Sequence, residues 1–151
     1  MFSNNDISYG TSSCNIADIN NFITHYIDLF ITQNQEKFAK KFLSKYLNKK
    51  IIGINIEGAI KEKKIHFTQL KKILEGLFNA NNNIQIIILS SPNRYKYIKN
   101  QVSGFGLKYV ASSYLTETIL DAAALIKQMD LVISPDTSIV HIASAFNIPT
   151  I

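Results

Sequence analysis

The sequence predicts an α/β fold, a Rossmann-like parallel sheet flanked by helices. From residue 50 onward, short apolar runs rich in β-branched residues alternate with segments whose apolar residues recur at helical spacing. Strands that alternate with helices of about 10–15 residues are typical of parallel sheets with right-handed crossovers. Hydrophobic residues make up 46% and charged residues 18% of the 151 residues, a balance that allows a packed core.

The amino-terminal third of the chain lacks the apolar strand patterns of the rest. Residues 1–15 are mostly polar and lack periodicity, and we interpret them as a linker. Apolar residues at helical spacing predict one amphipathic helix over 17–31 and a second over 34–47. We group both helices in a helical linker region, residues 16–49.

Residues 50–151 are expected to form one Rossmann-like domain. Strands are predicted at 51–56, 84–90, 108–112 and 130–134, with the start of another at 148–151, and helices at 67–78, 94–102, 116–129 and 138–146. Thr68 or a residue near it is expected to open the first of these helices, Gly104 to end the second, and Thr116 to cap the third. Ligands of such sheets bind beyond the carboxyl ends of the strands, which selects the loops 55–64, 90–94 and 134–138.

The loop at 134–138 enters the last predicted helix near Ser138. The first N–H groups of a helix have no internal partners, and the helix dipole makes that end positive. With the hydroxyls of Thr137 and Ser138, this end predicts a phosphate site. Asp136 would repel a phosphate and suits sugar hydroxyls better. The alternative is that Asp136 or Thr137 is only a helix cap. His141 is expected to pack or to contact the ligand, rather than to catalyse.

The other two loops carry weaker signals. Gly58 permits a close backbone approach and is followed by three lysines within 61–64, which could reach a diphosphate or simply be solvated. Asn93 or Arg94 could touch a ribose or a base, and the alternative is that Ser91 or Asn93 caps a helix. Neither the G-x-G-x-x-G fingerprint nor a P-loop is present in the sequence.

Charge and composition bear on the class of partner. The net charge is +5, from fifteen lysines and the single arginine Arg94 among the basic residues. Because proteins that bind bases and phosphates favour arginine, we expect no nucleic-acid partner; binding of an anionic polymer, which salt would weaken, is the remaining alternative.

Cys14 is the only cysteine and the three histidines are scattered, so neither an internal disulfide nor a metal site is predicted. The sequence shows neither a secretory signal nor an apolar run long enough for a membrane span.

Two stretches resemble the carboxy-terminal domain of glycosyltransferase family 9, the lipopolysaccharide heptosyltransferases. The stretch DLVISPDTSIVHIASAFNIPTI at 130–151 matches the family pattern at Asp136, Thr137, His141, Ala143, Ala145, Pro149 and Thr150. Upstream, IIGINIEGAIKEKKIHF at 51–67 matches at Asn55, Gly58, Ala59 and Lys63. The sequence departs from the pattern at Ser138, where the family usually has glycine, and at Ile65, where it usually has tryptophan.

The resemblance implies a GT-B architecture, of which this chain would be the carboxy-terminal half, cut short. It implies a nucleotide-sugar donor, with ADP-heptose as a candidate, and transfer with inversion and without a metal or other cofactor. Thr137 and Ser138 would hold the diphosphate, Asp136 would touch the sugar, and Lys63 would stabilise the charge of the leaving group. The catalytic base would lie in the absent amino-terminal domain.

The resemblance also implies partners and a location. The acceptor would be a glycan or a lipid-linked glycan, and the protein would work in the cytoplasm, with peripheral association at the inner face of the inner membrane as an option. The isolated chain is expected to bind nucleotide weakly and to transfer nothing. A non-catalytic module that binds a nucleotide or nucleotide-sugar is the alternative, because Ser138 and the loop at 90–94 depart from the family.

Overall fold

The computed structural model describes residues 29–58 and 64–151, and its centre is a four-stranded parallel sheet in the order β3-β2-β1-β4. The strands are β1 (Lys50–Asn55), β2 (Ile84–Leu89), β3 (Val110–Ser112) and β4 (Leu131–Ile133). Each lies within two residues of its predicted bounds, so the predicted α/β class and parallel sheet are confirmed. Thr150 forms a parallel bridge with Val132, which places residues near the carboxyl end beside β4.

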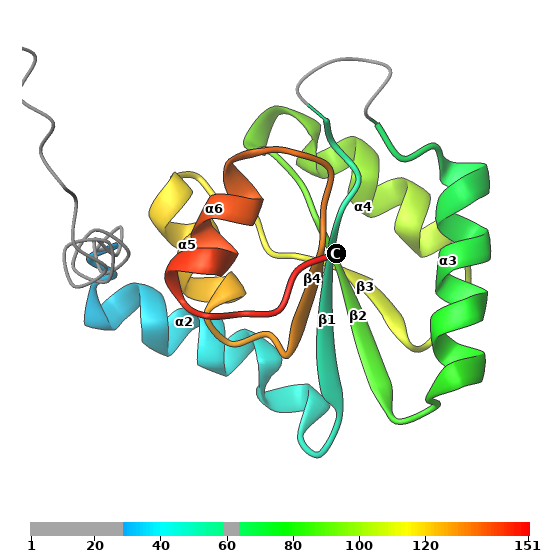
Figure 1. Ribbon diagram of the computed structural model, residues 1–151, viewed down its shortest axis with the longest axis horizontal. Helices are drawn as coiled ribbons and strands as arrows, with labels where there is room; N and C mark the ends of the chain where they lie inside the picture. Colours follow the sequence, from blue (N-terminus) through cyan, green and yellow to red (C-terminus); the bar gives the residue numbers. More distant parts are fainter. Residues whose placement is uncertain (1–28, 59–63) are drawn as a thin grey trace, which may run out of the picture.

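Helices cover both faces of this sheet (Figure 1). Helices α3 (Phe67–Ala80) and α4 (Tyr95–Gly104) lie on one face. Helices α2 (Gln33–Leu43), α5 (Ile119–Ile126) and α6 (Ser138–Ala145) lie on the other. Short 3-10 turns, η1 (Ser44–Tyr46) and η3 (Pro92–Arg94), precede β1 and α4. The fold is therefore a three-layer sandwich of helices, sheet and helices.

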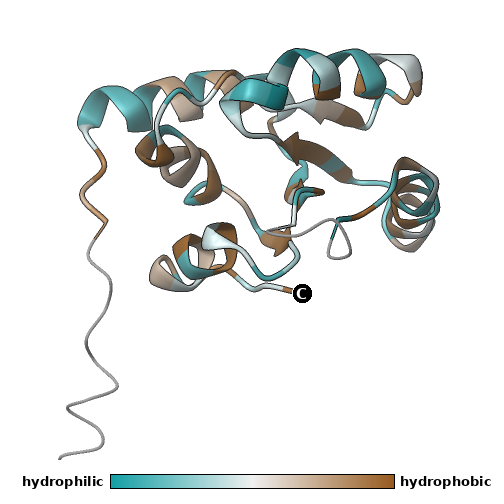
Figure 2. Ribbon diagram, turned by 90° about the horizontal axis from the view of Figure 1, so that it is seen from above, coloured by the Kyte–Doolittle hydropathy of each residue, from teal (hydrophilic) through white to brown (hydrophobic). Residues whose placement is uncertain are grey.

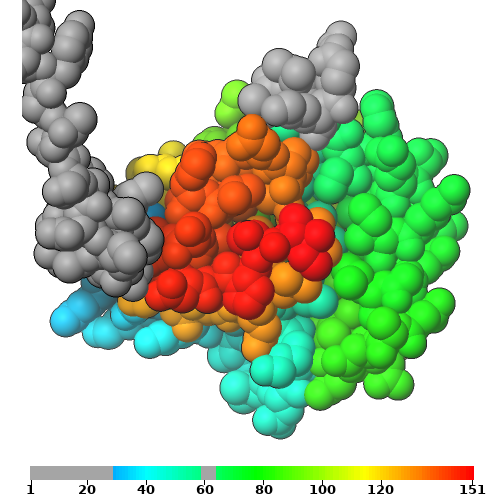
Figure 3. All heavy atoms as spheres, in the orientation of Figure 1, coloured from blue at the N-terminus to red at the C-terminus, as the bar shows by residue number. Residues whose placement is uncertain are grey.

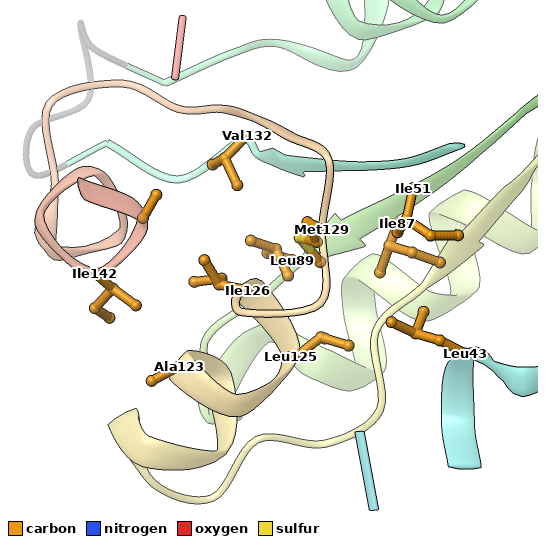
Figure 4. Close-up of a cluster of buried hydrophobic side chains, with 11 residues drawn as sticks. Leu43, Ile51, Ile87, Leu89, Ala123, Leu125, Ile126, Met129, Val132 and Ile142 are labelled. Carbon is orange, nitrogen blue, oxygen red and sulfur yellow. The ribbon is translucent and has the colours of Figure 1, made fainter. Parts of the chain in front are cut away.

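The central strands are apolar on both faces because both faces are covered by helices. All of β1 except Lys50 is buried, and so is the whole of β2, as expected for a parallel sheet between two helical layers. Alternate residues of each strand point to opposite layers, so Ile51 packs towards α2 and α5 while Ile52 packs towards α3 and α4. In Figure 2 the strands carry the apolar colour along the middle of the molecule, and Figure 4 shows the cluster that includes Ile51.

The predicted cap of α5 is wrong by two residues. Helix α5 begins after Thr118, whose hydroxyl accepts a hydrogen bond from the Asp121 N–H, whereas Thr116 was the expected cap. The carboxylate of Asp121, three residues after Thr118, accepts a hydrogen bond from the Thr118 N–H, which completes a capping box. Helix α3 begins at Phe67, the predicted first residue, and its cap is His66, a residue near Thr68; the His66 N–H donates to the Gln69 side chain.

Helix α2 is tied to α5, although it precedes the sheet in sequence. Gln35 Nε2 donates a hydrogen bond of 2.9 Å to Asp121, and Lys127 forms a 2.6 Å ion pair with Glu36. Ala39 and Leu43 are buried, so the second helix of the predicted linker region packs as part of this layer. Of the helix predicted over 17–31, residues 17–28 lie outside the described residues and 29–31 are not helical.

The carboxyl edge of the sheet is bordered by α6 and the last residues of the chain. In Figure 3 this segment, coloured orange to red, forms the front of the molecule beside the green surface of α3. Because strands β1 to β4 run parallel, all four carboxyl ends meet at the same edge. Residues from loops that are distant in sequence are thereby brought together there.

The buried hydroxyl of Tyr114, which follows β3, should make the protein less stable at alkaline pH. Its ring packs edge-on against Phe38 and Phe42, and its hydroxyl donates a 2.9 Å hydrogen bond to the Asp121 carbonyl. Burial, with a smaller contribution from the Asp121 charge, raises the pKa of Tyr114 to about 12. The unfolded chain loses this proton near pH 10, so the native state binds more protons and stability should fall as pH rises from about 10 to 12.

Tyr114→Phe should remove this component of the alkaline loss. The variant should lose about 1 kcal/mol at neutral pH with the hydrogen bond, and its urea midpoint should decline less than that of the wild type above pH 10. Tyr97→Phe, at a tyrosine that is 49% exposed, is the control and should keep the wild-type decline. Equal declines in Tyr114→Phe and the wild type would contradict the assignment.

Candidate functional site

A cavity of about 510 Å³ lies at the carboxyl edge of the sheet. It is bordered by the residues that follow all four strands and by the first turns of α5 and α6. Its lining residues are Asn55, Glu57, Gly58, Leu89, Ser90, Ser91, Pro92, Ser113, Thr116, Glu117, Thr118, Ile119, Ala122, Thr137, Ser138 and Ile139. The position agrees with the rule that selected the three loops from the sequence, and the volume suits a small-molecule ligand.

Asn55, the last residue of β1, holds two of these loops together. Its side chain is 5% exposed, and its amide nitrogen lies 3.0 Å from the Glu57 carbonyl, 3.0 Å from Ser134 Oγ and 3.1 Å from Thr137 Oγ1. Its amide oxygen accepts a 3.1 Å hydrogen bond from the Glu57 N–H. One buried amide therefore sets the path of the chain after β1 and the start of α6.

The amino end of α6 opens onto the cavity through Thr137 and Ser138. Thr137 is the N-cap, and its hydroxyl accepts a hydrogen bond from the Ile139 N–H at 3.3 Å and lies 3.2 Å from Ser134 Oγ. The capping role that the sequence left open is thus confirmed for Thr137. Because both residues also line the cavity, capping does not remove this helix end from contact with a ligand.

Glu57 links the loops after β1 and β2. Its carboxylate accepts a 2.6 Å hydrogen bond from the Ser91 N–H and lies 3.4 Å from Arg94 Nε. Glu57 and Glu117 are the acidic residues of the lining, and none of the described lining residues is a lysine or an arginine. Within the described chain, the amino end of the α6 dipole is therefore the positive element beside the cavity, and the charged side chains that line it are acidic.

Three hydroxyls at the β2–β3 end of the cavity were not predicted as site residues. Ser113 is 2% exposed and Thr116 is 6% exposed, while Ser90 is half-buried. Thr116 Oγ1 donates a 3.4 Å hydrogen bond to the Ser90 carbonyl. The available signal was a polar residue directly after an apolar strand run, which Ser90 and Ser113 both satisfy.

The structure brings three of the predicted site residues together. Gly58, Thr137 and Ser138 line the cavity. Asn93, Asp136 and His141 are exposed and are not among its lining residues. Lys63 lies outside the described residues. The ligand roles of all these residues remain predictions.

The described segments hold neither a metal-binding cluster of side chains nor a helix that could cross a membrane. Within residues 29–58 and 64–151, histidine, cysteine and acidic side chains do not gather in the groups of three or more that hold a metal ion. Across the same residues, every helix is too short or too polar to cross a bilayer.

The fold is similar to that of solved glycosyltransferases. E. coli ADP-heptose LPS heptosyltransferase II aligns over 82% of the chain with a TM-score of 0.65 and 13% identity. A family 9 glycosyl transferase from Veillonella parvula DSM 2008 aligns over 81% with a TM-score of 0.65 and 18% identity. E. coli heptosyltransferase WaaC, solved with ADP, aligns over 74% with a TM-score of 0.56 and 21% identity.

The chain is shorter than these relatives, spanning 38%, 35% and 35% of their respective lengths. No curated protein shows significant sequence similarity to it. The model of glycosyltransferase family 9 (heptosyltransferase) matches residues 21–151, which include the whole sheet and every cavity-lining residue. On that match, the chain belongs to glycosyltransferase family 9, the heptosyltransferase family.

Proposed function

We propose that this chain is the nucleotide-sugar-binding part of a glycosyltransferase that transfers heptose or a related sugar to lipopolysaccharide or another surface glycan. The observation that carries the proposal is the cavity at the carboxyl edge of the sheet, onto which the amino end of α6 opens, in a member of family 9. A similar structure, WaaC, was solved with ADP, which supports a nucleoside diphosphate as the core of the ligand.

The donor would bind through its diphosphate at Thr137 and Ser138. Ser138 borders the cavity, and the positive end of the α6 dipole lies there, although the Ile139 and Val140 N–H groups are already bonded to Thr137. Asn55 fixes the Thr137 hydroxyl in place. Lys63, Asp136, Asn93 and His141 stay predicted contacts, Lys63 with the diphosphate and Asp136 with the sugar.

The reaction would be a direct displacement at the anomeric carbon. An acceptor hydroxyl attacks that carbon, a base removes the hydroxyl proton, and the bond to the diphosphate breaks with its electron pair on the leaving oxygen, which inverts the anomeric centre. The positive end of the α6 dipole and the Ser138 hydroxyl would stabilise the charge that develops on the diphosphate. The base and the acceptor site would belong to an amino-terminal domain outside this chain, so the chain alone should bind donor without transferring sugar.

Thr137→Ala tests the diphosphate site. Calorimetry of the chain with ADP, GDP, UDP and CDP should show binding of at least one, and the variant should weaken that binding on the order of tenfold because a hydroxyl next to a charged group is lost. Thr32→Ala is the matched control, since Thr32 is also a threonine N-cap whose hydroxyl accepts a backbone N–H, at the start of α2. It should cost about 1 kcal/mol of stability and leave binding unchanged. Equal affinities of Thr137→Ala and the wild type would refute the assignment.

A non-catalytic nucleotide-sugar-binding module is the second candidate. It is favoured by Glu57 and Glu117 in the lining, by the lack of lysine and arginine among the described lining residues, and by Ser138 at a usual glycine position. Sugar transfer from the bound donor to a glycan, measured with the amino-terminal domain present, separates the two functions. Donor binding without transfer under those conditions would favour the module.

A further inference from the structure

Two serine hydroxyls are buried without a partner at the β2–β3 end of the cavity. Ser90 follows β2 and Ser113 follows β3, both line the cavity, and within the described residues neither Oγ has a hydrogen-bond partner. Their backbones are held in place, since the Ser113 N–H donates to the Ile88 carbonyl at 2.9 Å and the Ser90 carbonyl accepts from Thr116. The two residues are therefore held in place, and each Oγ is closed off from solvent, so a hydroxyl reaches a ligand in the cavity only after its side chain turns about the Cα–Cβ bond.

Unpartnered buried hydroxyls are uncommon, because each one gives up its bonds to water without replacement. One other side-chain atom of the described chain shares this state, Gln85 Oε1, and Gln85 does not line the cavity. Two of the three such atoms thus belong to cavity-lining residues that directly follow the paired strands β2 and β3. A polar ligand group that reaches this end would supply the missing bonds.

The order of the strands tells which part of a ligand reaches the serines. Thr137 follows β4 and Ser113 follows β3, and β1 and β2 lie between these strands. At about 4.8 Å per strand, three spacings separate the two ends of the cavity by about 14 Å. A diphosphate at Thr137 would therefore place its nucleoside towards Ser90 and Ser113. Leu89 and Ala122 line the cavity as well and offer apolar contact to the faces of a flat ring.

We propose that the hydroxyls of Ser90 and Ser113 bind the polar edge of the nucleobase and so contribute to the choice of base. The inference rests on the proposed function, because it takes the ligand to be a nucleoside diphosphate. A hydroxyl both donates and accepts, so the pair can bond carbonyl oxygens, ring nitrogens or amino groups on a base edge. Inorganic pyrophosphate bound at Thr137 has no base, so it makes no hydrogen bond with these two serines.

The test compares nucleotides with pyrophosphate. Ser113→Ala and Ser90→Ala should each weaken the tightest-binding of ADP, GDP, UDP and CDP about two- to tenfold, leave pyrophosphate affinity unchanged, and narrow the spread of affinities among the four bases. Thr137→Ala should weaken nucleotide and pyrophosphate alike. Ser112→Ala, next to Ser113 but outside the lining of this cavity, is the matched control and should change neither.

Thermal unfolding without ligand adds an independent measurement. Ser113→Ala deletes an unsatisfied buried hydroxyl, so its melting temperature should equal or exceed that of the wild type. Unchanged nucleotide affinity in both serine variants, or an equal loss for nucleotide and pyrophosphate, would overturn the inference while the proposed function stands. If the wild type bound none of the four nucleotides, the proposed function itself would be overturned, and the inference with it.

Discussion

Asn55→Asp should destabilise the chain by about 3 kcal/mol and abolish measurable nucleotide binding. The substitution keeps the size of the side chain but replaces the amide that donates to the Glu57 carbonyl with a carboxylate oxygen. The Ser134 and Thr137 hydroxyls can turn to donate, whereas the Glu57 carbonyl, 3.0 Å away, cannot. A buried negative charge would then face a carbonyl oxygen and the proposed diphosphate site.

Acid should restore part of the stability of Asn55→Asp. Burial raises the pKa of a carboxyl group, and the protonated form can donate to the carbonyl as the amide does. Asn83→Asp is the matched control, because Asn83 also donates to a carbonyl, that of Asn48 at 3.0 Å, but is exposed. The control should shift the urea midpoint little. Similar midpoint shifts in both variants would show that Asn55 does not organise the site.

Gly53→Val should lower the free energy of unfolding by about 3 kcal/mol. Gly53 lies in β1 with β2 and β4 on either side, and a Cβ atom there would overlap the sulfur of Met129, a residue 4% exposed. Met129 lies in the cluster of Figure 4 with Val132, whose Cγ2 would be 3.6 Å from the new Cβ. A side chain at this position therefore requires the buried Met129 side chain to shift its thioether end.

A double-mutant cycle identifies Met129 as the cause. Met129→Ala alone opens a cavity and should cost about 2–5 kcal/mol. The double variant Gly53→Val with Met129→Ala should lose less free energy of unfolding than the two single variants lose together. Gly76→Val is the matched control, since a Cβ atom at Gly76 in α3 meets nothing within 4 Å. It should change stability by less than about 0.5 kcal/mol. Strict additivity in the cycle would rule out the overlap.

Much of the fold could be predicted because local patterns encode it. The isoleucine-rich runs at β1 and β2 are buried on both faces, and such runs are characteristic of a parallel sheet whichever helices cover it. The cap of α5 was predicted wrongly, because more than one threonine near its start could serve as the cap. At α5 the cap is Thr118 and not Thr116 because the Asp121 carboxylate accepts a hydrogen bond from the Thr118 N–H. The same carboxylate also accepts a hydrogen bond from the Gln35 side chain of α2.

The site was predicted only where its signal is local. Thr137, Ser138 and Gly58 belong to loops that the topology of parallel sheets selects, and all three line the cavity. Glu57 was not predicted, because its partners Ser91 and Arg94 follow a different strand. Ser90 lies in the selected loop 90–94 but was not singled out, and Ser113 lies outside the selected loops, since only the pairing of β2 with β3 brings the two to one end of the cavity.

By itself, the amino-acid sequence determined the class of fold, the loops in which a ligand would be sought and the family. These properties follow from periodicity and short motifs, which act over a few residues. The tertiary structure alone decided which side chains share a site. Asn55 and Thr137 are 82 positions apart in the chain and 3.1 Å apart in space, because β1 and β4 pair as neighbours, and no spacing in the sequence reports that pairing.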